Sequence, residues 1–341
     1  MKRYFFLSFI LFVALYGSTQ VSYTPTAANL QSRAEFRDMK LGIFIHWGIY
    51  SLMGQGEWYL SVDSVPYQEY AKAAGAFYPI GFNADEWVSN IKASGAQYIC
   101  FTSRHHDGFS MWHTRQTPYN IVDATPFKRD VLKELADACH KQGIRLHLYY
   151  SLVDWGREDY PLGESARGCG KDTTKADYAH YLAFMKAQLT ELLTEYGPIG
   201  AIWLDGEWDH AHDAEPFDWR LDELYALIHD LQPACLIANN HHHANRPGED
   251  IQCFERDVPG ENLHGLSGKS GVSEDLPLET CMTMNSSWGY KIKDIWYLSL
   301  DEIRAAQQQV NNKRANLLLN IGPRPDGRFP QTAIERLNSL R

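Results

Sequence analysis

The sequence lacks an excess of basic residues. It contains 32 Lys and Arg against 42 Asp and Glu, which gives a formal net charge of -10. Nucleic acids and anionic membrane surfaces bind basic faces, so this balance argues against both as partners. The chain also has no GxSxG turn, no HExxH helix and no glycine-rich phosphate loop. These absences argue against serine-dependent acyl transfer and against phosphoryl transfer.

Cysteine is scarce and never occurs as a CxxC pair. Cys100 falls in an apolar strand pattern and Cys139 in a helical pattern, so both are expected to be buried thiols. In an exported protein a disulfide among the other four remains possible, but the spacing does not define one. The six residues are Cys100, Cys139, Cys169, Cys235, Cys253 and Cys281.

One long apolar run is found at the amino terminus, where Lys2 and Arg3 precede residues 4–16. Small and polar residues follow, and this pattern predicts a secretory signal peptide over residues 1–20. The run is shorter than the roughly 20 residues of a membrane-spanning helix, although a retained anchor is the alternative. The expected mature protein, residues 21–341, is exported to the periplasm or secreted and has no membrane span.

The remainder of the chain alternates apolar strand patterns with helical patterns, and no long linker divides it. Strands are expected at 41–45, 97–102, 145–151, 201–204, 235–238, 250–254, within 279–290, and at 316–321. Helices are expected at 29–39, 84–94, 130–142, 176–196, 219–231 and 300–312. This alternation predicts a single α/β domain folded as a (β/α)8 barrel of the TIM type. A doubly wound open sheet is the alternative.

The segment GAIWLDGEWDH, residues 200–210, combines a buried strand with a carboxylate at its carboxyl end. Active sites of α/β barrels lie at this end of the strands, so Asp205 is a candidate catalytic nucleophile. Alternatively, Asp205 only forms the turn before Gly206 or caps the next helix.

Other expected strand ends supply imidazole, carboxylate and indole groups, and few nucleophilic Ser or Cys. The residues are His46, Glu57, Trp58, His105, His106, Tyr150, Trp203, Asp205, Asn239, Glu255, Glu279 and Trp288. One interpretation is cleavage of a glycosidic bond by paired carboxylates, while His and Trp side chains bind the sugar. For any single histidine the alternative is a core imidazole bonded to the backbone.

A second interpretation is a metal-dependent hydrolase, with His105, His106, Asp107 and the run 241–243 as ligands. Adjacent residues of an extended chain point to opposite sides, which makes joint coordination by His105 and His106 unfavourable. The run 241–243 can equally be a solvated loop. No metal is therefore expected.

Six motifs in chain order resemble the α-L-fucosidases of glycoside hydrolase family 29. They are LGIFIHWGIYS, GEWYL, YICFTSRHHDGFSMW, LHLYYSLVDW, IWLDG and NLLLNIGPRPDG, and the similarity extends from about residue 35 to 330. The resemblance implies a (β/α)8-like barrel that removes terminal α-L-fucose from glycans with retention of configuration. It implies no metal and no cofactor.

The resemblance also implies roles for individual residues. The family's nucleophile falls on Asp205, and Trp203 resembles a residue that stacks on the sugar. Trp58 belongs to the same expected substrate-binding group. Fucose hydroxyls are expected to bind His46, Glu57, His105 and His106, while Phe44 and Trp288 resemble the wall around the C6 methyl group and Tyr150 a further neighbour.

The acid/base residue is less clearly defined, because its position varies among branches of the family. One branch pattern falls on Glu255 and another on Glu279, and we favour Glu255. Either glutamate could instead be a buried residue that orients Arg256 or its loop. A non-catalytic fucose-binding protein on the same scaffold is the alternative function.

The chain departs from the family pattern at its end. Most members carry a β-sandwich after the barrel, whereas this sequence ends at Arg341 within what should be the last helix. The expectation is either a compact variant or a fragment whose barrel is poorly closed. Neither the preferred fucosyl linkage nor the oligomeric state follows from the sequence.

Overall fold

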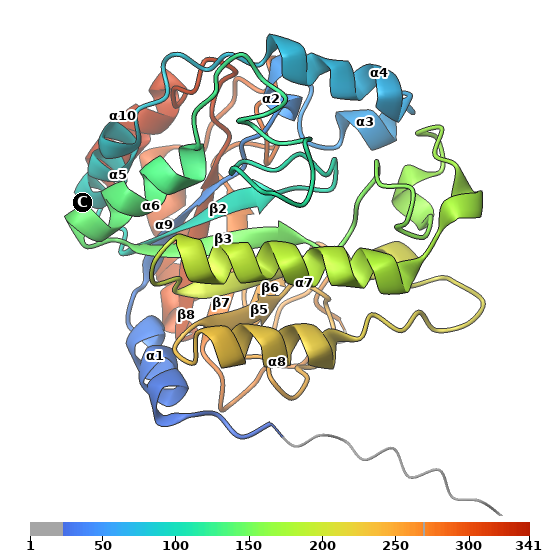
Figure 1. Ribbon diagram of the computed structural model, residues 1–341. Coiled ribbons are helices and arrows are strands. Elements are labelled where there is room, and N and C mark those ends of the chain that lie inside the picture. The colour runs from blue at the N-terminus through green and yellow to red at the C-terminus, as the bar shows by residue number, and fades with distance from the viewer. Residues whose placement is uncertain (1–22, 269) are drawn as a thin grey trace, which may run out of the picture.

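The computed structural model describes residues 23–268 and 270–341, and the predicted signal segment 1–20 lies outside them. One sheet of eight parallel strands curves into a nearly closed barrel (Figure 1). The strand order is β5-β4-β3-β2-β1-β8-β7-β6. The strands are β1 (Leu41–Ile45), β2 (Tyr98–Arg104), β3 (Arg145–Ser151), β4 (Ala201–Asp205), β5 (Leu236–Asn239), β6 (Gln252–Glu255), β7 (Leu278–Thr283) and β8 (Ala315–Ile321).

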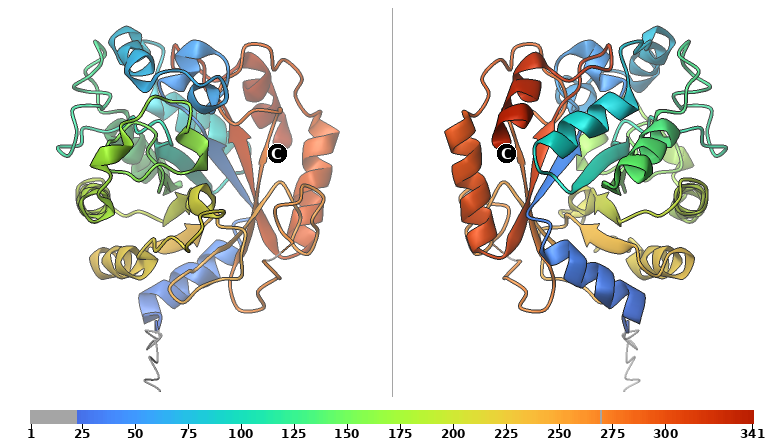
Figure 2. Two further views of the ribbon diagram at one scale, coloured as in Figure 1. Left: turned by 90° about the vertical axis from the view of Figure 1, so that its right-hand side faces the viewer. Right: turned by 90° about the vertical axis from the view of Figure 1, so that its left-hand side faces the viewer.

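Helices surround the barrel, with α9 beside α10 on one side and α7 beside α8 on the other (Figure 2). The long helices are α1 (Ala27–Arg37), α5 (Ala84–Ala93), α6 (Val131–Gln142), α7 (Tyr178–Glu195), α8 (Leu221–Leu231), α9 (Leu300–Asn312) and α10 (Gln331–Leu340). Short helices α2 (Tyr50–Met53), α3 (Tyr59–Val62) and α4 (Tyr67–Ala71) follow β1. Within the described residues, loops without a helix connect β5 to β6 and β6 to β7.

The predicted barrel is confirmed, and the open-sheet alternative is wrong. Strands β1 and β3 begin and end at the predicted residues, and the other strands lie within two or three residues of their predicted positions. The segment 279–290 begins as β7 and continues as a loop. These patterns predicted the fold because a strand buried on both faces is a short continuous apolar run.

The expected poor closure at the end of the chain is not observed. Strand β8 pairs along its length with β7 on one side and with β1 on the other. The weak seam lies instead between β5 and β6, which share a single bridge between Ala238 and Ile251. The connection between these two strands, residues 240–251, is a loop that contains no helix.

Side chains reinforce this seam. The carboxylate of Asp250 is fully buried and accepts a hydrogen bond from the backbone N–H of Ile237 at 2.8 Å. It also pairs with Arg33 of α1 at 2.5 Å and contacts His229 of α8 at 2.9 Å. One side chain thus joins α1, α8 and the two weakly paired strands.

The hydrophobic core has an inner and an outer part. The inner cluster fills the barrel and includes Phe44, Tyr98 and Trp203, with Phe36 of α1 and Met39 packed at the amino-terminal end. The outer cluster lies between strands and helices. All six cysteines are buried free thiols, which confirms the prediction for Cys100 and Cys139. Among the described residues, no helix is long and apolar enough to cross a membrane.

We predict that Asp250→Asn lowers the free energy of unfolding by about 3 kcal/mol, because Arg33 then lacks its buried partner. Glu69→Gln is the control, since Glu69 forms an exposed pair with Lys72 and should change stability by less than about 1 kcal/mol. Urea denaturation measures both variants. Equal effects would show that the seam does not depend on this ion pair.

Candidate active site

A cavity of about 240 Å³ opens at the carboxyl-terminal end of the barrel. This volume is below the roughly 300–1,000 Å³ of sites for drug-sized ligands, so it suits a group the size of one sugar. Aromatic rings and polar groups share the lining. The residues are Phe44, His46, Trp58, His105, His106, Tyr149, Trp203, Asp205, Trp208, Asn240, His242, Glu255, Leu266, Cys281 and Trp288.

Strand alternation decides which side chains reach this cavity. Residues two apart on a strand share a face, so Trp203 and Asp205 of β4 both point inward. On β3 the inward residue is Tyr149, whereas Tyr150 points outward and donates a hydrogen bond to Gln188 of α7 at 2.8 Å. The expectation that Tyr150 lies beside the substrate is therefore wrong, because the preceding residue, Tyr149, lines the cavity instead.

The carboxylate of Asp205 lies in the cavity, with 8% of the residue exposed. Its Oδ2 accepts a hydrogen bond from the hydroxyl of Tyr149 at 2.8 Å, and its Oδ1 accepts from Trp208 Nε1 at 3.3 Å. Burial, followed by the nearby charge of Glu255, raises the pKa of Asp205 to about 6, while the donors oppose this rise. Asp205 is thus ionised at neutral pH.

A second carboxylate faces Asp205 across an amide. Nδ2 of Asn240 lies 2.9 Å from Oε2 of Glu255 and 3.5 Å from Oδ1 of Asp205. The two oxygens can therefore be no farther apart than the sum of these distances. His242 Nε2 lies 3.8 Å from the same Glu255 oxygen. Of the two predicted glutamates, the structure brings Glu255 beside Asp205.

Glu279 lies deeper in the barrel. It precedes Cys281 by two residues on the inward face of β7, and so occupies the layer below the cavity floor. Its carboxylate accepts hydrogen bonds from Tyr98 Oη at 2.7 Å and from Trp203 Nε1 at 2.8 Å. Burial raises the pKa of Glu279 to about 7. Its contacts orient the Trp203 indole, and it does not line the cavity.

His46 enters the cavity with a defined tautomer. Asn320 Nδ2 donates to the carbonyl of Trp288, which leaves Asn320 Oδ1 to accept from His46 Nδ1–H at 2.6 Å. Burial lowers the pKa of His46 to about 3, so the ring is neutral. Its Nε2 therefore carries a lone pair that can accept a hydrogen bond from a hydroxyl group.

Ser151 holds the ring of His106. The Ser151 hydroxyl lies 2.7 Å from His106 Nδ1 and 2.7 Å from the carbonyl oxygen of Val153. Burial lowers the pKa of His106 to about 3. Its Nε2 lies 3.5 Å from Asp205 Oδ2, so a sugar hydroxyl bound here can contact both atoms. His105 also lines the cavity, and its buried Nδ1 has no hydrogen-bond partner among the described residues.

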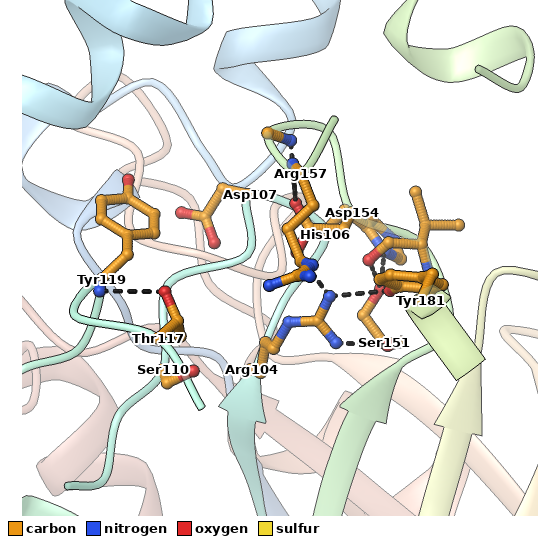
Figure 3. Close-up of polar contacts among 12 residues, drawn as sticks. Arg104, His106, Asp107, Ser110, Thr117, Tyr119, Ser151, Asp154, Arg157 and Tyr181 are labelled. Carbon is orange, nitrogen blue, oxygen red and sulfur yellow. Dashed lines mark hydrogen bonds and ion pairs between the residues drawn. The ribbon is translucent and has the colours of Figure 1, made fainter. Parts of the chain in front are cut away.

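A buried ion pair supports the end of β2 that carries these histidines. Arg104 is fully buried and donates to Asp154 at 2.6 Å, to Tyr181 Oη at 2.8 Å and to the carbonyl of Ser151 at 3.2 Å (Figure 3). The pairing of β2 with β3 shifts between Thr102 and Arg104. The guanidinium thus joins the irregular end of β2 to the same Ser151 that orients His106.

Glu57 does not line the cavity, unlike its neighbour Trp58. The Glu57 carboxylate accepts hydrogen bonds from the backbone N–H of Gly289 at 2.6 Å and from Ser287 Oγ at 3.4 Å. Burial raises the pKa of Glu57. Its position beneath the loop after β7 supports Trp288, whose ring lies 5.2 Å from that of His46.

No group of three or more His, Cys, Asp or Glu side chains is arranged to hold a metal ion in the described parts of the chain. Two candidates for the metal interpretation have other partners. Asp107 accepts a hydrogen bond from Tyr70 at 2.8 Å, and His241 Nε2 contacts Glu249 at 2.9 Å.

Six lining residues were not predicted as site residues: Tyr149, Trp208, Asn240, His242, Leu266 and Cys281. Signals existed for four of them, including Tyr149, which directly precedes the predicted Tyr150. Trp208 lies in the segment 200–210, His242 lies in the histidine run, and Asn240 follows Asn239, whose amide instead donates to Tyr225. Leu266 and Cys281 carry no sequence signal for a site.

A family model for Alpha-L-fucosidase matches residues 11–340. The chain belongs to the α-L-fucosidase family. It is therefore a glycoside hydrolase, and the resemblance seen in the motifs is confirmed.

Relatives in this family are similar over most of the chain. Rat plasma alpha-L-fucosidase is 31% identical, and the alignment covers 98% of this chain and 74% of the relative. Alpha-L-fucosidase isoenzyme 1 from Paenibacillus thiaminolyticus has a TM-score of 0.80 at 31% identity, with 92% of this chain and 75% of that chain covered. Alpha-L-fucosidase AlfC from Lactobacillus casei has a TM-score of 0.77 at 30% identity, with 91% and 97% covered.

The adjacent tyrosines of β3 offer a matched test of the fucosidase site. Tyr149→Phe removes a hydrogen bond to a carboxylate worth about 1.5–3 kcal/mol, so we expect kcat/KM to fall at least about tenfold. The loss of this donor also raises the pKa of Asp205 above about 6, which moves the acid limb of kcat/KM to higher pH.

Tyr150→Phe is the control and should change kcat/KM by less than about twofold, at a cost of about 1 kcal/mol in stability. The measurement is hydrolysis of 4-nitrophenyl α-L-fucoside between pH 4 and 9. A larger kinetic effect at Tyr150 than at Tyr149 would contradict the assignment of the inward face.

Proposed function

We propose that this fucosidase removes terminal α-L-fucose with retention of configuration, using Asp205 as nucleophile and Glu255 as acid/base. The observation that carries the proposal is the bridging amide of Asn240, which limits the separation of the two carboxylates. Retaining glycosidases place these groups about 5–5.5 Å apart, and inverting enzymes about 6.5–9.5 Å apart. The Asn240 bridge holds one oxygen of each carboxylate close to the other, which is compatible with the retaining geometry.

In the first step Asp205 attacks C1 of the bound fucose. The bond from C1 to the glycosidic oxygen breaks, and the leaving oxygen takes the proton of Glu255, which gives a fucosyl ester on Asp205. In the second step Glu255 removes a proton from water, and the water oxygen attacks C1. Fucose is released, Asp205 regains its charge and Glu255 is again protonated.

Neutral histidines and aromatic rings supply the fucose site. His46 presents a fixed Nε2 acceptor for a sugar hydroxyl, His106 lines the same cavity, and His105 stacks on Tyr149 with the ring centroids 5.4 Å apart. Phe44, Trp203 and Trp288 offer apolar surface to the ring and its methyl group. A cavity sized for one sugar favours exo-action.

Solved structures of a relative support this choice of substrate. AlfC from Lactobacillus casei has been solved with its α-L-fucose product, and one mutant form has been solved with Fuca(1,6)GlcNAc and with 4-nitrophenyl-a-L-fucopyranoside. A fucosylated glycan is accordingly the substrate that we propose here. A non-catalytic fucose-binding protein would not need Glu255 beside Asp205, so the geometry favours the enzyme.

The test is a set of three variants. Asp205→Ala should lower hydrolysis of 4-nitrophenyl α-L-fucoside by at least about a thousandfold and retain sugar binding, as expected for loss of a nucleophile. Glu255→Ala should lose about 10²–10⁴-fold on a substrate with a poor leaving group. Azide should restore its turnover of the aryl substrate and yield fucosyl azide.

Glu279→Ala is the comparison. It should weaken sugar binding through Trp203, and azide should not rescue it. If azide rescued Glu279→Ala but not Glu255→Ala, Glu279 would be the acid/base instead of Glu255. Near-normal hydrolysis by Asp205→Ala would show that Asp205 is not the nucleophile.

We also propose that the protein is exported, on the strength of the signal pattern in residues 1–20. Expression of the full chain in a bacterial host should give a mature amino terminus near residue 21 outside the cytoplasm. Amino-terminal sequencing of the cell fractions tests this. An intact Met1 on cytoplasmic protein would contradict it.

A further inference from the structure

A groove of about 270 Å³ lies next to the fucose cavity. Trp58 and Trp288 line both spaces, so the two indoles form a shared wall. Four charged residues also line the groove: Glu57, Asp63, Arg256 and Lys291. The mechanism described above uses none of these four charges.

The groove lies on the side of the cavity toward which the leaving group is expected to extend. This step rests on the proposed function, in which Glu255 protonates the oxygen that joins fucose to the rest of the glycan. The aglycone must therefore begin beside Glu255 and extend out of the cavity. Arg256 is the next residue of the chain, and its side chain enters the groove that shares Trp58 and Trp288 with the cavity.

Arg256 is held in place before any ligand binds. Its guanidinium lies over the Trp288 ring at 5.1 Å from the centroid and donates to the carbonyl of Ser286 at 3.2 Å. Its backbone has a φ of 61°, a left-handed conformation that is unfavourable for a residue with a Cβ atom. A side chain fixed in this way loses little conformational freedom on binding.

Neither cation in the groove forms a direct ion pair in the described part of the chain, and the charge of Arg256 acts on the nearby Glu57 carboxylate by opposing the rise of its pKa. No ion pair within the described residues involves Arg256 or Lys291, and the carboxylate of Glu57 is occupied by Gly289 and Ser287. Asp63 is exposed in the turn that ends α3. In a chain with a net charge of -10, the two cations of this groove offset its two carboxylates, so the groove is less negative than the chain as a whole.

We propose that this groove binds the leaving-group part of the substrate, and that Arg256 and Lys291 select an aglycone that carries a carboxylate or a sulfate. Arg recognises either anion through parallel N–H donors, and Lys adds a point charge. The enzyme would thus act preferentially on fucose next to an acidic or sulfated sugar.

The experiment compares three glycans that differ only in charge: a fucosylated N-acetyllactosamine, its sialylated form and its sulfated form. For the wild type we expect kcat/KM to be about fivefold higher for at least one acidic glycan at low ionic strength, as for one exposed ion pair. The preference should decrease at 1 M salt, where the Debye length is about 3 Å. The glycan that is preferred identifies the anion.

Lys291→Gln and Arg256→Gln should each bring this preference toward unity. Lys293→Gln is the matched control, because Lys293 lies on the same loop and does not line the groove. Its preference should match that of the wild type. Equal kcat/KM for all three glycans, or the same loss in Lys293→Gln as in Lys291→Gln, would overturn the proposal.

The proposed function and the proposed role of the groove are tested by different substrates. Hydrolysis of 4-nitrophenyl α-L-fucoside, which lacks a second sugar, reports on the proposed function alone. Its absence in the wild type would overturn that function. Normal hydrolysis without any charge preference would overturn only the role of the groove.

Discussion

The site depends on keeping the Asp205 carboxylate charged inside a cavity walled by aromatic rings. Burial and the neighbouring Glu255 favour its protonation, whereas Tyr149, Trp208 and Asn240 donate to the charged form. These donors come from β3, from the short helix after β4 (Glu207–His210) and from the loop after β5. The balance leaves a pKa of about 6, so the group is a carboxylate at neutral pH without the shielding of bulk water.

The neutral state of the histidines also affects the Asp205 carboxylate. A protonated imidazole beside Asp205 would form an ion pair that competes with the sugar, and burial prevents this for His46 and His106. Asn320 then fixes which nitrogen of His46 carries the proton, and Ser151 holds the ring of His106. The network around Arg104 reaches the cavity through Ser151, which explains why a fully buried cation lies one residue before the His105–His106 pair.

Sequence patterns predicted the barrel and the strand ends, but not the face of every residue. The doublets Tyr149–Tyr150 and Asn239–Asn240 offer two equivalent side chains at a strand end, and the register of the strand decides which one points inward. The depth of a side chain within the barrel was also not predictable. Glu255 and Glu279 both lie on short strands, but Glu255 reaches the cavity and Glu279 lies in the layer below it. The backbone and loop contacts that place Glu57 under Trp288 leave no pattern in the sequence.

The two loops that replace helices around β6 link the fold to the site. The loop from β5 to β6 connects the two strands that share a single bridge, and the two loops together supply Asn240, His242 and Leu266 to the cavity. The most direct measurement of the central claim is to trap the intermediate with 2-deoxy-2-fluoro-α-L-fucosyl fluoride and map the label by peptide mass spectrometry. The account predicts one fluorofucosyl ester, on Asp205. A label on another carboxylate, or turnover through an inverted first product without any label, would contradict it.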